Sequence, residues 1–201
     1  MPVKKWVWKI ANRLRGKKSP RMQLLGLMPR QGVCAEIGVW KGRFSRKIIQ
    51  KTHPKQLHLI DPWAFQADFS ERMFGGKVAK DQNDMDAIYQ EVNQDLGTWD
   101  EVTIHRSYSS EAAPQFPDHY FDWVYVDGNH YYDYVLQDLY LFADKIKPGG
   151  FLAGDDYLWT SPELNGHQPV KKAVNDFLAD RTPEFSFYKI LDSQFILRKQ
   201  E

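Results

Sequence analysis

Short apolar runs alternate with amphipathic segments along most of this chain, and this alternation constrains the fold more than any other feature. We predict strands at residues 33–38, 56–61, 101–106, 121–127 and 151–155, and helices at residues 44–50, 83–96, 131–146 and 170–178. Strands that alternate with helices form a parallel sheet with helices on both faces. Residues 185–191 and 194–198 predict a closing hairpin that adds an antiparallel strand near one edge. We therefore expect an α/β fold with a doubly wound, mostly parallel sheet.

The charge is distributed unevenly and divides the chain into a basic arm, residues 1–29, and a domain, residues 30–201. The first 35 residues hold nine Lys and Arg and no acid, whereas the rest holds 18 basic and 26 acidic residues. Trp6, Ile10 and Leu14 are spaced as on one face of a helix. Such an arm could contact a membrane surface peripherally, or pack on its own domain or across a homodimer. We expect no nucleic acid partner.

The chain can bury one sizeable core, since 42% of its 201 residues are hydrophobic. We expect a cytoplasmic protein, because the low cysteine content fits a reducing compartment. A single cysteine, Cys34, excludes a disulfide within the chain. No stretch approaches 18 consecutive apolar residues, and no apolar segment of signal-peptide type follows the basic N-terminus.

Acidic residues end several of the predicted strands, namely Glu36, Asp61, Asp127 and Asp155. The carboxyl ends of parallel strands meet at one edge of a sheet, and ligands of such folds bind there. We therefore expect these carboxylates to gather along one rim and to form a binding site.

Two glycines, Gly38 and Gly42, flank the turn between the first strand and its helix. The pattern E-x-G-x-x-x-G lacks the second glycine of the dinucleotide fingerprint, so a ligand with a carboxylate or a hydroxyl suits this turn better than a pyrophosphate. Asp61 follows about twenty residues later and suits the hydroxyls of a ribose. Tyr108 and Ser109 follow the third strand, where an adenine would lie. The alternatives are glycines needed only for packing, and a helix N-cap at Ser109.

Three aspartates at neighbouring strand ends, Asp127, Asp155 and Asp156, predict a metal site. Carboxylates this close repel one another unless a cation lies among them, and hard oxygen ligands suit Mg²⁺. His130 follows Asp127 by three residues and could reach a substrate hydroxyl at the same metal. The alternative is that the aspartates cap helices and that His130 is a surface residue.

Four blocks of the sequence together resemble class I S-adenosylmethionine-dependent methyltransferases. They are EIGVWKG at 36–42, IDPW at 60–63, DWVYVDGNHYY at 122–132 and KPGGFLAGDD at 147–156. The chain most resembles the branch of metal-dependent sugar O-methyltransferases of the macrocin type and cephalosporin hydroxylase-like proteins. The resemblance covers most of residues 30–198 and leaves the basic arm outside it.

The resemblance implies a seven-stranded, Rossmann-like sheet with an antiparallel final strand, and S-adenosylmethionine as the cofactor. It implies cofactor binding by Glu36, Gly38, Val39, Trp40, Gly42, Ser45, Asp61, Pro62, Trp63, Tyr108, Ser109 and Asp127. It also implies a Mg²⁺ site at Asp127, Asp155 and Asp156, with Asp127 and His130 as catalytic residues and His130 as the base.

We therefore expect an O-methyltransferase, dependent on Mg²⁺, that methylates a hydroxyl of a sugar-containing or diol/catechol small molecule. One alternative is a nicotinamide-dependent oxidoreductase on a similar fold, against which the missing G-x-G-x-x-G argues. The other is a non-catalytic binding module that docks through its basic arm. Residues 65–82 read as an irregular insert that could cover the pocket.

Overall fold

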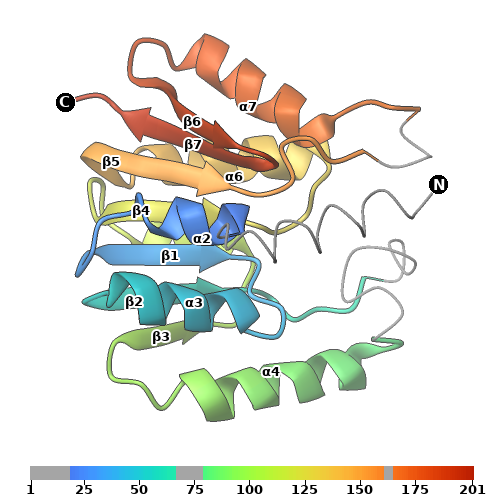
Figure 1. Ribbon diagram of the computed structural model, residues 1–201. Helices are drawn as coiled ribbons and strands as arrows, with labels where there is room; N and C mark the ends of the chain where they lie inside the picture. The colour runs from blue at the N-terminus through green and yellow to red at the C-terminus, as the bar shows by residue number, and fades with distance from the viewer. Residues whose placement is uncertain (1–18, 67–78, 161–164) are drawn as a thin grey trace.

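The computed structural model describes residues 19–66, 79–160 and 165–201, which form a seven-stranded sheet between two layers of helices (Figure 1). The strand order is β3-β2-β1-β4-β5-β7-β6. The amphipathic helix expected near the N-terminus and most of the expected insert lie outside the described residues.

Five strands run parallel: β1 (Val33–Ile37), β2 (Gln56–Ile60), β3 (Val102–His105), β4 (Phe121–Val126) and β5 (Ile146–Gly154). β7 (Gln194–Lys199) is antiparallel to β5 and to the edge strand β6 (Phe185–Leu191). The predicted α/β fold, with a mostly parallel sheet and an antiparallel final strand, is confirmed.

The register of the central strands makes their carboxyl ends level with one another. Ile37, the last residue of β1, pairs with Ile60 of β2 on one side and with Val126 of β4 on the other. Asp61 and Asp127 each follow these partners directly, so both acidic residues leave the sheet at the same edge.

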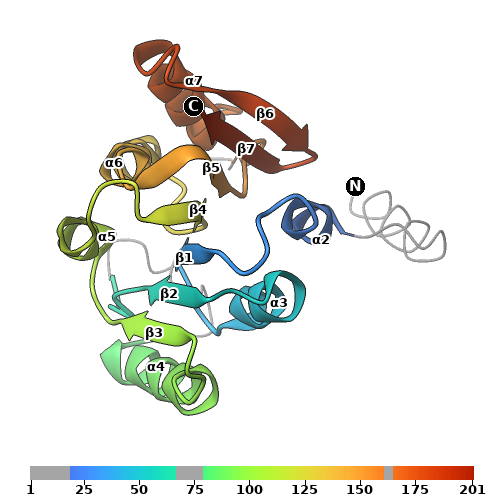
Figure 2. The same cartoon turned by 90° about the vertical axis from the view of Figure 1, so that its left-hand side faces the viewer.

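The helices cover both faces of the sheet (Figure 2). On one side lie α2 (Pro20–Leu25), α3 (Arg43–Thr52) and α4 (Gln82–Leu96), which share a buried cluster with Trp123 and Ile196 of the sheet. On the other lie α5 (Ser109–Ala112), the 3₁₀ helix η3 (Ala113–Gln115), α6 (Tyr132–Ala143) and α7 (Pro169–Asp180), which pack on Val124 and Leu152. None of the described helices has the length and apolarity needed to cross a membrane.

β5 begins five residues before the predicted strand, and α6 ends three residues before the predicted helix end. The sequence KPGG reads locally as a helix terminator, but Ile146 already pairs with Phe121, ahead of an irregularity in the β4–β5 register. A side chain at Gly150 would lie 2.8 Å from the Asp122 carbonyl oxygen, so the strand passes β4 closely there. Tertiary pairing therefore incorporates a segment that local signals assign to a turn.

α2 belongs to the packed domain although its residues fall within the predicted basic arm. Ser19 caps the helix by accepting a hydrogen bond from Met22 N, and Pro20 occupies its first turn. Leu24, Leu25 and Met28 are buried against the sheet face that also carries α3. This packing places Arg21 beside the carboxyl ends of the strands.

Candidate active site

A cavity of about 520 Å³ opens at the carboxyl ends of β1, β2 and β4. Its volume lies within the usual range for small-molecule and cofactor sites. Its wall contains these residues that the sequence predicts as cofactor-binding: Glu36, Gly38, Val39, Trp40, Asp61, Pro62, Tyr108, Ser109 and Asp127. The other three predicted residues, Gly42, Ser45 and Trp63, do not line the cavity but support the residues that do.

Gly38 allows the ends of β1 and β4 to approach closely. Its φ is +86°, and a Cβ there would lie 2.3 Å from the Asp127 carbonyl oxygen. Gly42 also has a positive φ, +65°, and precedes α3 directly, where a Cβ would lie 2.7 Å from Leu96 Cδ1. Gly38 is therefore required by its backbone neighbour, whereas Gly42 is favoured by its left-handed backbone, with the Leu96 side chain of α4 packed closely against it.

The Asp61 carboxylate holds the loop that follows β1. Its Oδ2 accepts hydrogen bonds from Val39 N and Trp40 N, each at 2.9 Å, and its Oδ1 accepts one from Trp63 N at 2.7 Å. Burial raises the pKa of Asp61 above its ordinary value, and these hydrogen bonds oppose that rise. Trp63 is fully buried and donates its Nε1–H to the Trp40 carbonyl oxygen at 2.9 Å, which tightens the same loop.

Glu36 is a buried carboxyl group in the cavity wall. Only 1% of its surface is exposed, and its Oε2 accepts a hydrogen bond from the Ser45 hydroxyl. Burial raises its pKa to about 8, while the Ser45 hydrogen bond lowers it. A cationic ligand in the cavity would favour the ionised form of this group.

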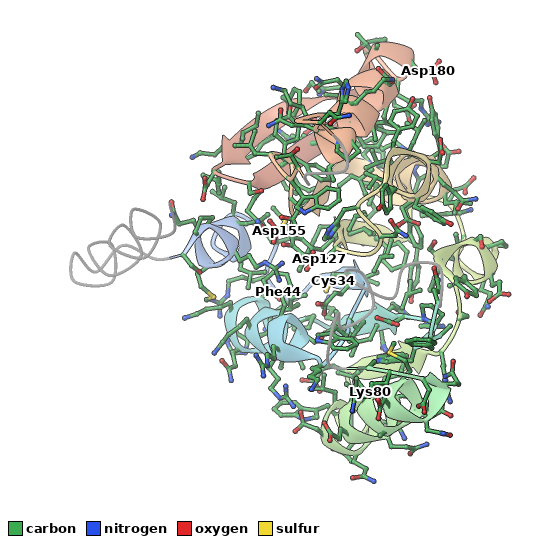
Figure 3. The ribbon with its side chains drawn as sticks, turned by 90° about the vertical axis from the view of Figure 1, so that its right-hand side faces the viewer. Cys34, Phe44, Lys80, Asp127, Asp155 and Asp180 are labelled. Carbon is green, nitrogen blue, oxygen red and sulfur yellow. The ribbon has the colours of Figure 1, made fainter. Side chains whose placement is uncertain are left out.

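Arg21 is a site residue that sequence reasoning missed. Its Nη2 lies 2.8 Å from Asp127 Oδ2, and its Nε donates to Asp155 Oδ2 at 2.6 Å. The guanidinium also lies over the rings of Phe44 and Tyr125, with its carbon 5.2 Å and 5.9 Å from their centroids. Figure 3 shows Asp127 and Asp155 at the strand ends beside α2. The cap Ser19-Pro20 was the available signal for a helix here, but it does not indicate where Arg21 points.

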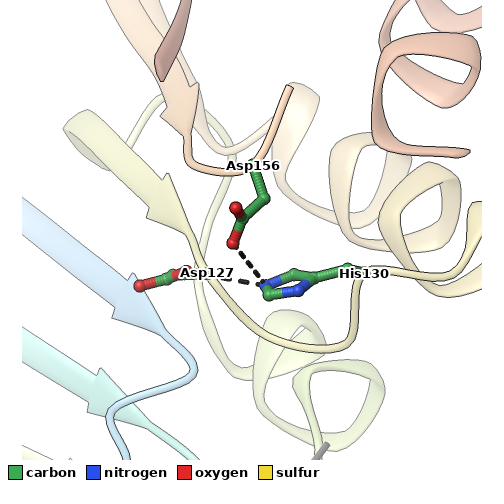
Figure 4. Close-up of side chains that lie close together, drawn as sticks. All are labelled: Asp127, His130 and Asp156. Carbon is green, nitrogen blue, oxygen red and sulfur yellow. Dashed lines mark ion pairs between the residues drawn. The ribbon is translucent and has the colours of Figure 1, made fainter. Parts of the chain in front are cut away.

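Asp127, His130 and Asp156 form a compact group at the ends of β4 and β5 (Figure 4). His130 Nε2 lies 3.7 Å from Asp127 Oδ1 and 3.4 Å from Asp156 Oδ2. One nitrogen or oxygen atom from each residue lies within 4.8 Å of the others. Burial lowers the pKa of His130, but the two carboxylates more than offset this and raise it above its ordinary value.

Asp155, which the sequence places in the metal site, has a different set of neighbours from Asp156. Its carboxylate accepts hydrogen bonds from Arg21, from the Gln194 side chain and from the backbone N–H of Asp156. Asp156 has a positive φ of 58°, so the backbone turns sharply between the two acids. The structure thus groups Asp127 and Asp156 with His130, and it pairs Asp155 with Arg21.

Of the aromatic residues near this rim, Trp159 lies against the catalytic candidate. Its ring packs edge-on to His130, with centroids 5.6 Å apart, and to Tyr131 at 6.1 Å. Tyr132 instead donates its hydroxyl to Asp176 of α7, on the outer side of α6. Trp159 is therefore the ring that packs against His130 in the described part of the chain, and Tyr131 packs against Trp159 in turn.

Asp138 is the second site residue that sequence reasoning missed. It lies on α6, is only 5% exposed and contributes to the cavity wall. Burial raises its pKa to about 7, and a hydrogen bond with Ser109 acts in the opposite direction. Its position inside a helical pattern, between Val135 and Leu139, was the only signal, since an acid on the apolar face of a helix needs a partner.

Comparison with known proteins identifies the family. The sequence profile described as "Methyltransferase domain" matches residues 35–157, which is more than half of the chain and includes Glu36, Asp61, Asp127, His130 and Asp156. The chain belongs to the methyltransferase domain family. The resemblance to class I S-adenosylmethionine-dependent methyltransferases is thereby confirmed, and the sheet order agrees with it. No curated protein matches the sequence.

Solved methyltransferase structures share the fold of this methyltransferase domain at low sequence identity. The O-methyltransferase NovP is 17% identical with a TM-score of 0.62, and the match covers 90% of this chain and 80% of NovP. An S-adenosylmethionine-dependent methyltransferase from Mesorhizobium loti is 11% identical with a TM-score of 0.59, covering 90% and 96%. The N-methyltransferase NodS from Bradyrhizobium japonicum WM9 is 16% identical with a TM-score of 0.56, covering 90% and 94%.

Proposed function

We propose that this methyltransferase transfers a methyl group from S-adenosylmethionine to a hydroxyl of a small molecule, and that His130 accepts the proton of that hydroxyl. The observation that carries the proposal is the double position of Asp127. Its carboxylate lines the cofactor-sized cavity and also forms part of the group with His130 and Asp156. The cofactor cavity and the candidate proton acceptor therefore meet at one residue.

The charges of the cavity wall support S-adenosylmethionine as the ligand. Its sulfonium and ammonium groups are cationic, and Glu36 and Asp127 place one buried and one mostly buried carboxyl group at the ends of β1 and β4. Asp61 keeps acceptor capacity beyond its three backbone hydrogen bonds and lines the same wall, so it suits a ribose hydroxyl. Tyr108 and Ser109 line the cavity farther along, after β3.

The carboxylates of Asp127 and Asp156 would hold a divalent cation, with the imidazole of His130 beside them. The three donor atoms lie close together, and among the described residues the buried Nε2 of His130 has no hydrogen-bond partner. Carboxylate oxygens suit Mn²⁺ as well as Mg²⁺. A bound cation would lower the pKa of an acceptor hydroxyl and would favour acceptors with two adjacent oxygens, as in a sugar diol or a catechol.

The surroundings of His130 support its role as the proton acceptor. The carboxylates of Asp127 and Asp156 both lie near His130 Nε2, and they stabilise the imidazolium form that results from proton uptake. Trp159 packs against the ring and limits its orientation. The remaining requirement for displacement is that the acceptor oxygen, methyl carbon and sulfur lie in line, which is a matter of positioning.

A proton acceptor at this position favours O-methylation over N-methylation. A hydroxyl must lose its proton to become an effective nucleophile, whereas a neutral amine attacks through its lone pair. The fold does not separate the two reactions, since NovP is described as an O-methyltransferase and NodS as an N-methyltransferase. The family match favours methyl transfer over the nicotinamide-dependent alternative and over a binding module.

The test is methyl transfer from S-adenosylmethionine to catechol, to a methyl glycoside with a vicinal diol, and to a primary amine. Each acceptor is assayed with EDTA, Mg²⁺ or Mn²⁺, and S-adenosylhomocysteine binding is measured by calorimetry. We expect turnover with an oxygen acceptor, loss of that turnover in His130→Gln, and retention in the exposed control Asp100→Asn. Methylation of the amine alone, or unchanged turnover in His130→Gln, would refute the proposed role of His130. A failure of S-adenosylhomocysteine to bind would refute the cofactor site itself.

Loss of turnover in His130→Gln does not by itself separate a base from a metal ligand, because the same nitrogen would serve either role. Metal binding is therefore measured directly, by titrating Mn²⁺ into wild type, His130→Gln and Asp156→Asn. We expect Asp156→Asn to weaken metal binding and His130→Gln to leave most of it. Equal loss of metal binding in both variants would assign His130 to the metal and contradict its role as base.

A further inference from the structure

Asp138 is a buried carboxyl group that the proposed methyl transfer does not use. It lies on α6, the helix that begins two residues after His130, and it is not part of the group of Asp127, His130 and Asp156. It lines the cavity, as does Ser109 of α5. Burying a carboxyl group costs free energy of folding unless a hydrogen-bond donor or a cation compensates it. The described part of the chain offers it a hydroxyl, from Ser109, and no cationic side chain in an ion pair.

The backbone around Asp138 leaves its carboxylate accessible to a ligand in the cavity. Gly128, in the loop after β4, lines the cavity, and a Cβ built on it would lie 3.7 Å from Asp138 Oδ2. Because residue 128 has no side chain, nothing from that position covers this oxygen. Ser109, at the start of α5, also lines the cavity and forms a hydrogen bond with the carboxylate.

The order of groups along the cavity determines which part of the cofactor lies near Asp138. Glu36 is the last residue but one of β1 and Asp127 follows β4 directly, while Asp61 follows β2, one strand farther toward the edge of the sheet. Ser109 follows β3, which is the edge strand. A nucleoside with its sulfonium near Asp127 and its ribose near Asp61 extends its base toward Ser109 and Asp138.

The loop after β3 supplies no acidic acceptor of its own to that base. Arg106, Ser107 and Tyr108 lie between β3 and α5, and the first acid after them, Glu111, accepts a hydrogen bond from Tyr108 N. The acidic acceptor nearest to Ser109 in the cavity wall is therefore Asp138, which approaches from α6. An adenine carries an amine with two N–H donors at its 6-position, and a carboxylate is a strong acceptor for such a donor.

We propose that Asp138 determines the specificity of the site for adenine by accepting a hydrogen bond from the exocyclic 6-amino group of the cofactor. The inference rests on the proposed function, since it requires an adenosine cofactor in this cavity. A purine with an oxygen at position 6 presents an acceptor to the carboxylate instead of a donor. Above the pKa of Asp138, where its carboxyl group is ionised and cannot donate, this would leave both groups buried without a hydrogen bond, so the site rejects the 6-oxo purine there.

The experiment compares S-adenosylhomocysteine with S-inosylhomocysteine, its 6-oxo analogue, by calorimetry on the full chain. We expect wild type to prefer the adenosine compound by about tenfold or more, because one ligand keeps the hydrogen bond and the other loses it. Asp138→Asn should lose or reverse this preference, because the amide can donate to a 6-oxo group. Asp133→Asn, on the exposed side of the same helix, is the matched control and should keep the wild-type preference.

The possible outcomes separate this inference from the function on which it rests. If neither compound binds wild type, the cofactor proposal fails. If S-adenosylhomocysteine binds wild type but both compounds bind equally, or if Asp138→Asn keeps the preference, the role of Asp138 is overturned and the cofactor proposal stands. If Asp138→Asn does not fold, Gly128→Val carries the test, because the Cβ at that position would already lie 3.7 Å from Asp138 Oδ2 and the larger side chain would cover the carboxylate. An unchanged preference in Gly128→Val would also overturn the inference.

Discussion

The Arg21 guanidinium of α2 lies 2.8 Å from the Asp127 carboxylate at the end of β4. The same guanidinium bonds Asp155, so one cation from the N-terminal helix neutralises two strand-end acids. The positive charge of Arg21 offsets the repulsion between the Asp127 and Asp155 carboxylates, so this pair does not need a metal ion at Asp155. It also makes the packing of α2 a condition for the geometry of the site.

Arg21→Ala should destabilise the protein by about 1–3 kcal/mol, because it leaves two mostly buried carboxylates without their cation, an effect that partial solvent exposure of Arg21 moderates. Mg²⁺ should then raise the melting temperature of Arg21→Ala more than that of wild type, since the acids are free to bind it. Thermal melts with EDTA and with Mg²⁺ measure both effects. The exposed control Arg30→Ala should behave as wild type. Equal melting temperatures for Arg21→Ala and wild type would contradict a structural role for the pair.

Gly38→Ala should destabilise the protein by about 3 kcal/mol or more, because the new Cβ would collide with the backbone of residues 127 and 128. Gly166→Ala is the matched control, since Gly166 has a similar φ of +83° but no atom within 4 Å of the new Cβ. The control should be destabilised only by backbone strain, by roughly 1–2 kcal/mol. Urea unfolding of the two variants separates collision from strain, and equal losses would show that the close approach of β1 and β4 is not limiting.

Asp61→Asn should lower the free energy of unfolding by about 1–3 kcal/mol and should also weaken S-adenosylhomocysteine binding. The amide nitrogen cannot accept a hydrogen bond, so at least one of the N–H groups of Val39, Trp40 and Trp63 loses its partner. Asp81→Asn is the control, because Asp81 caps α4 and Asn serves equally well at that position. Calorimetric binding and urea unfolding check the two effects. A stable variant with full affinity would show that the loop after β1 does not depend on Asp61.

Glu36→Gln should gain stability relative to wild type as the pH rises from 5 to 8. The pKa of Glu36 is about 8 in the folded protein and about 4.5 when unperturbed, so the folded state binds the proton more tightly. The stability from protonated Glu36 is complete below the lower pKa and is lost as the pH rises through the higher one, by at most about 1.4 kcal/mol per pH unit. The amide variant lacks this dependence.

The measurement for Glu36 is the difference in unfolding free energy between Glu36→Gln and wild type, by urea at several pH values. The exposed Glu91→Gln variant serves as the control and should show a difference that does not change with pH. A constant difference for Glu36→Gln as well would mean that Glu36 titrates near its ordinary pKa, with a cation compensating its burial.

The local pattern of the sequence was sufficient for the alternation of strands and helices and for the acids at the strand ends. Both follow from interactions between near neighbours: apolar periodicity selects the element, and in a parallel sheet every strand ends at the same edge. Glu36, Asp61 and Asp127 were found in this way, because each lies at a strand end wherever the strands pair. The start of β5 was placed too late, because its pairing with Phe121 outweighs the local signal of KPGG.

The tertiary structure decided which side chains share the site. Arg21 and Asp155 are 134 residues apart, and only the packing of Leu24 and Leu25 on the sheet brings them into contact. The backbone turn at Asp156 directs one of two adjacent acids toward His130 and leaves the other to Arg21. Asp138 enters the cavity because α6 packs beside α5. Sequence by itself therefore determined which edge carries the chemistry, whereas contacts between distant segments, which depend on how helices pack on the sheet, decided the partners of each charged group.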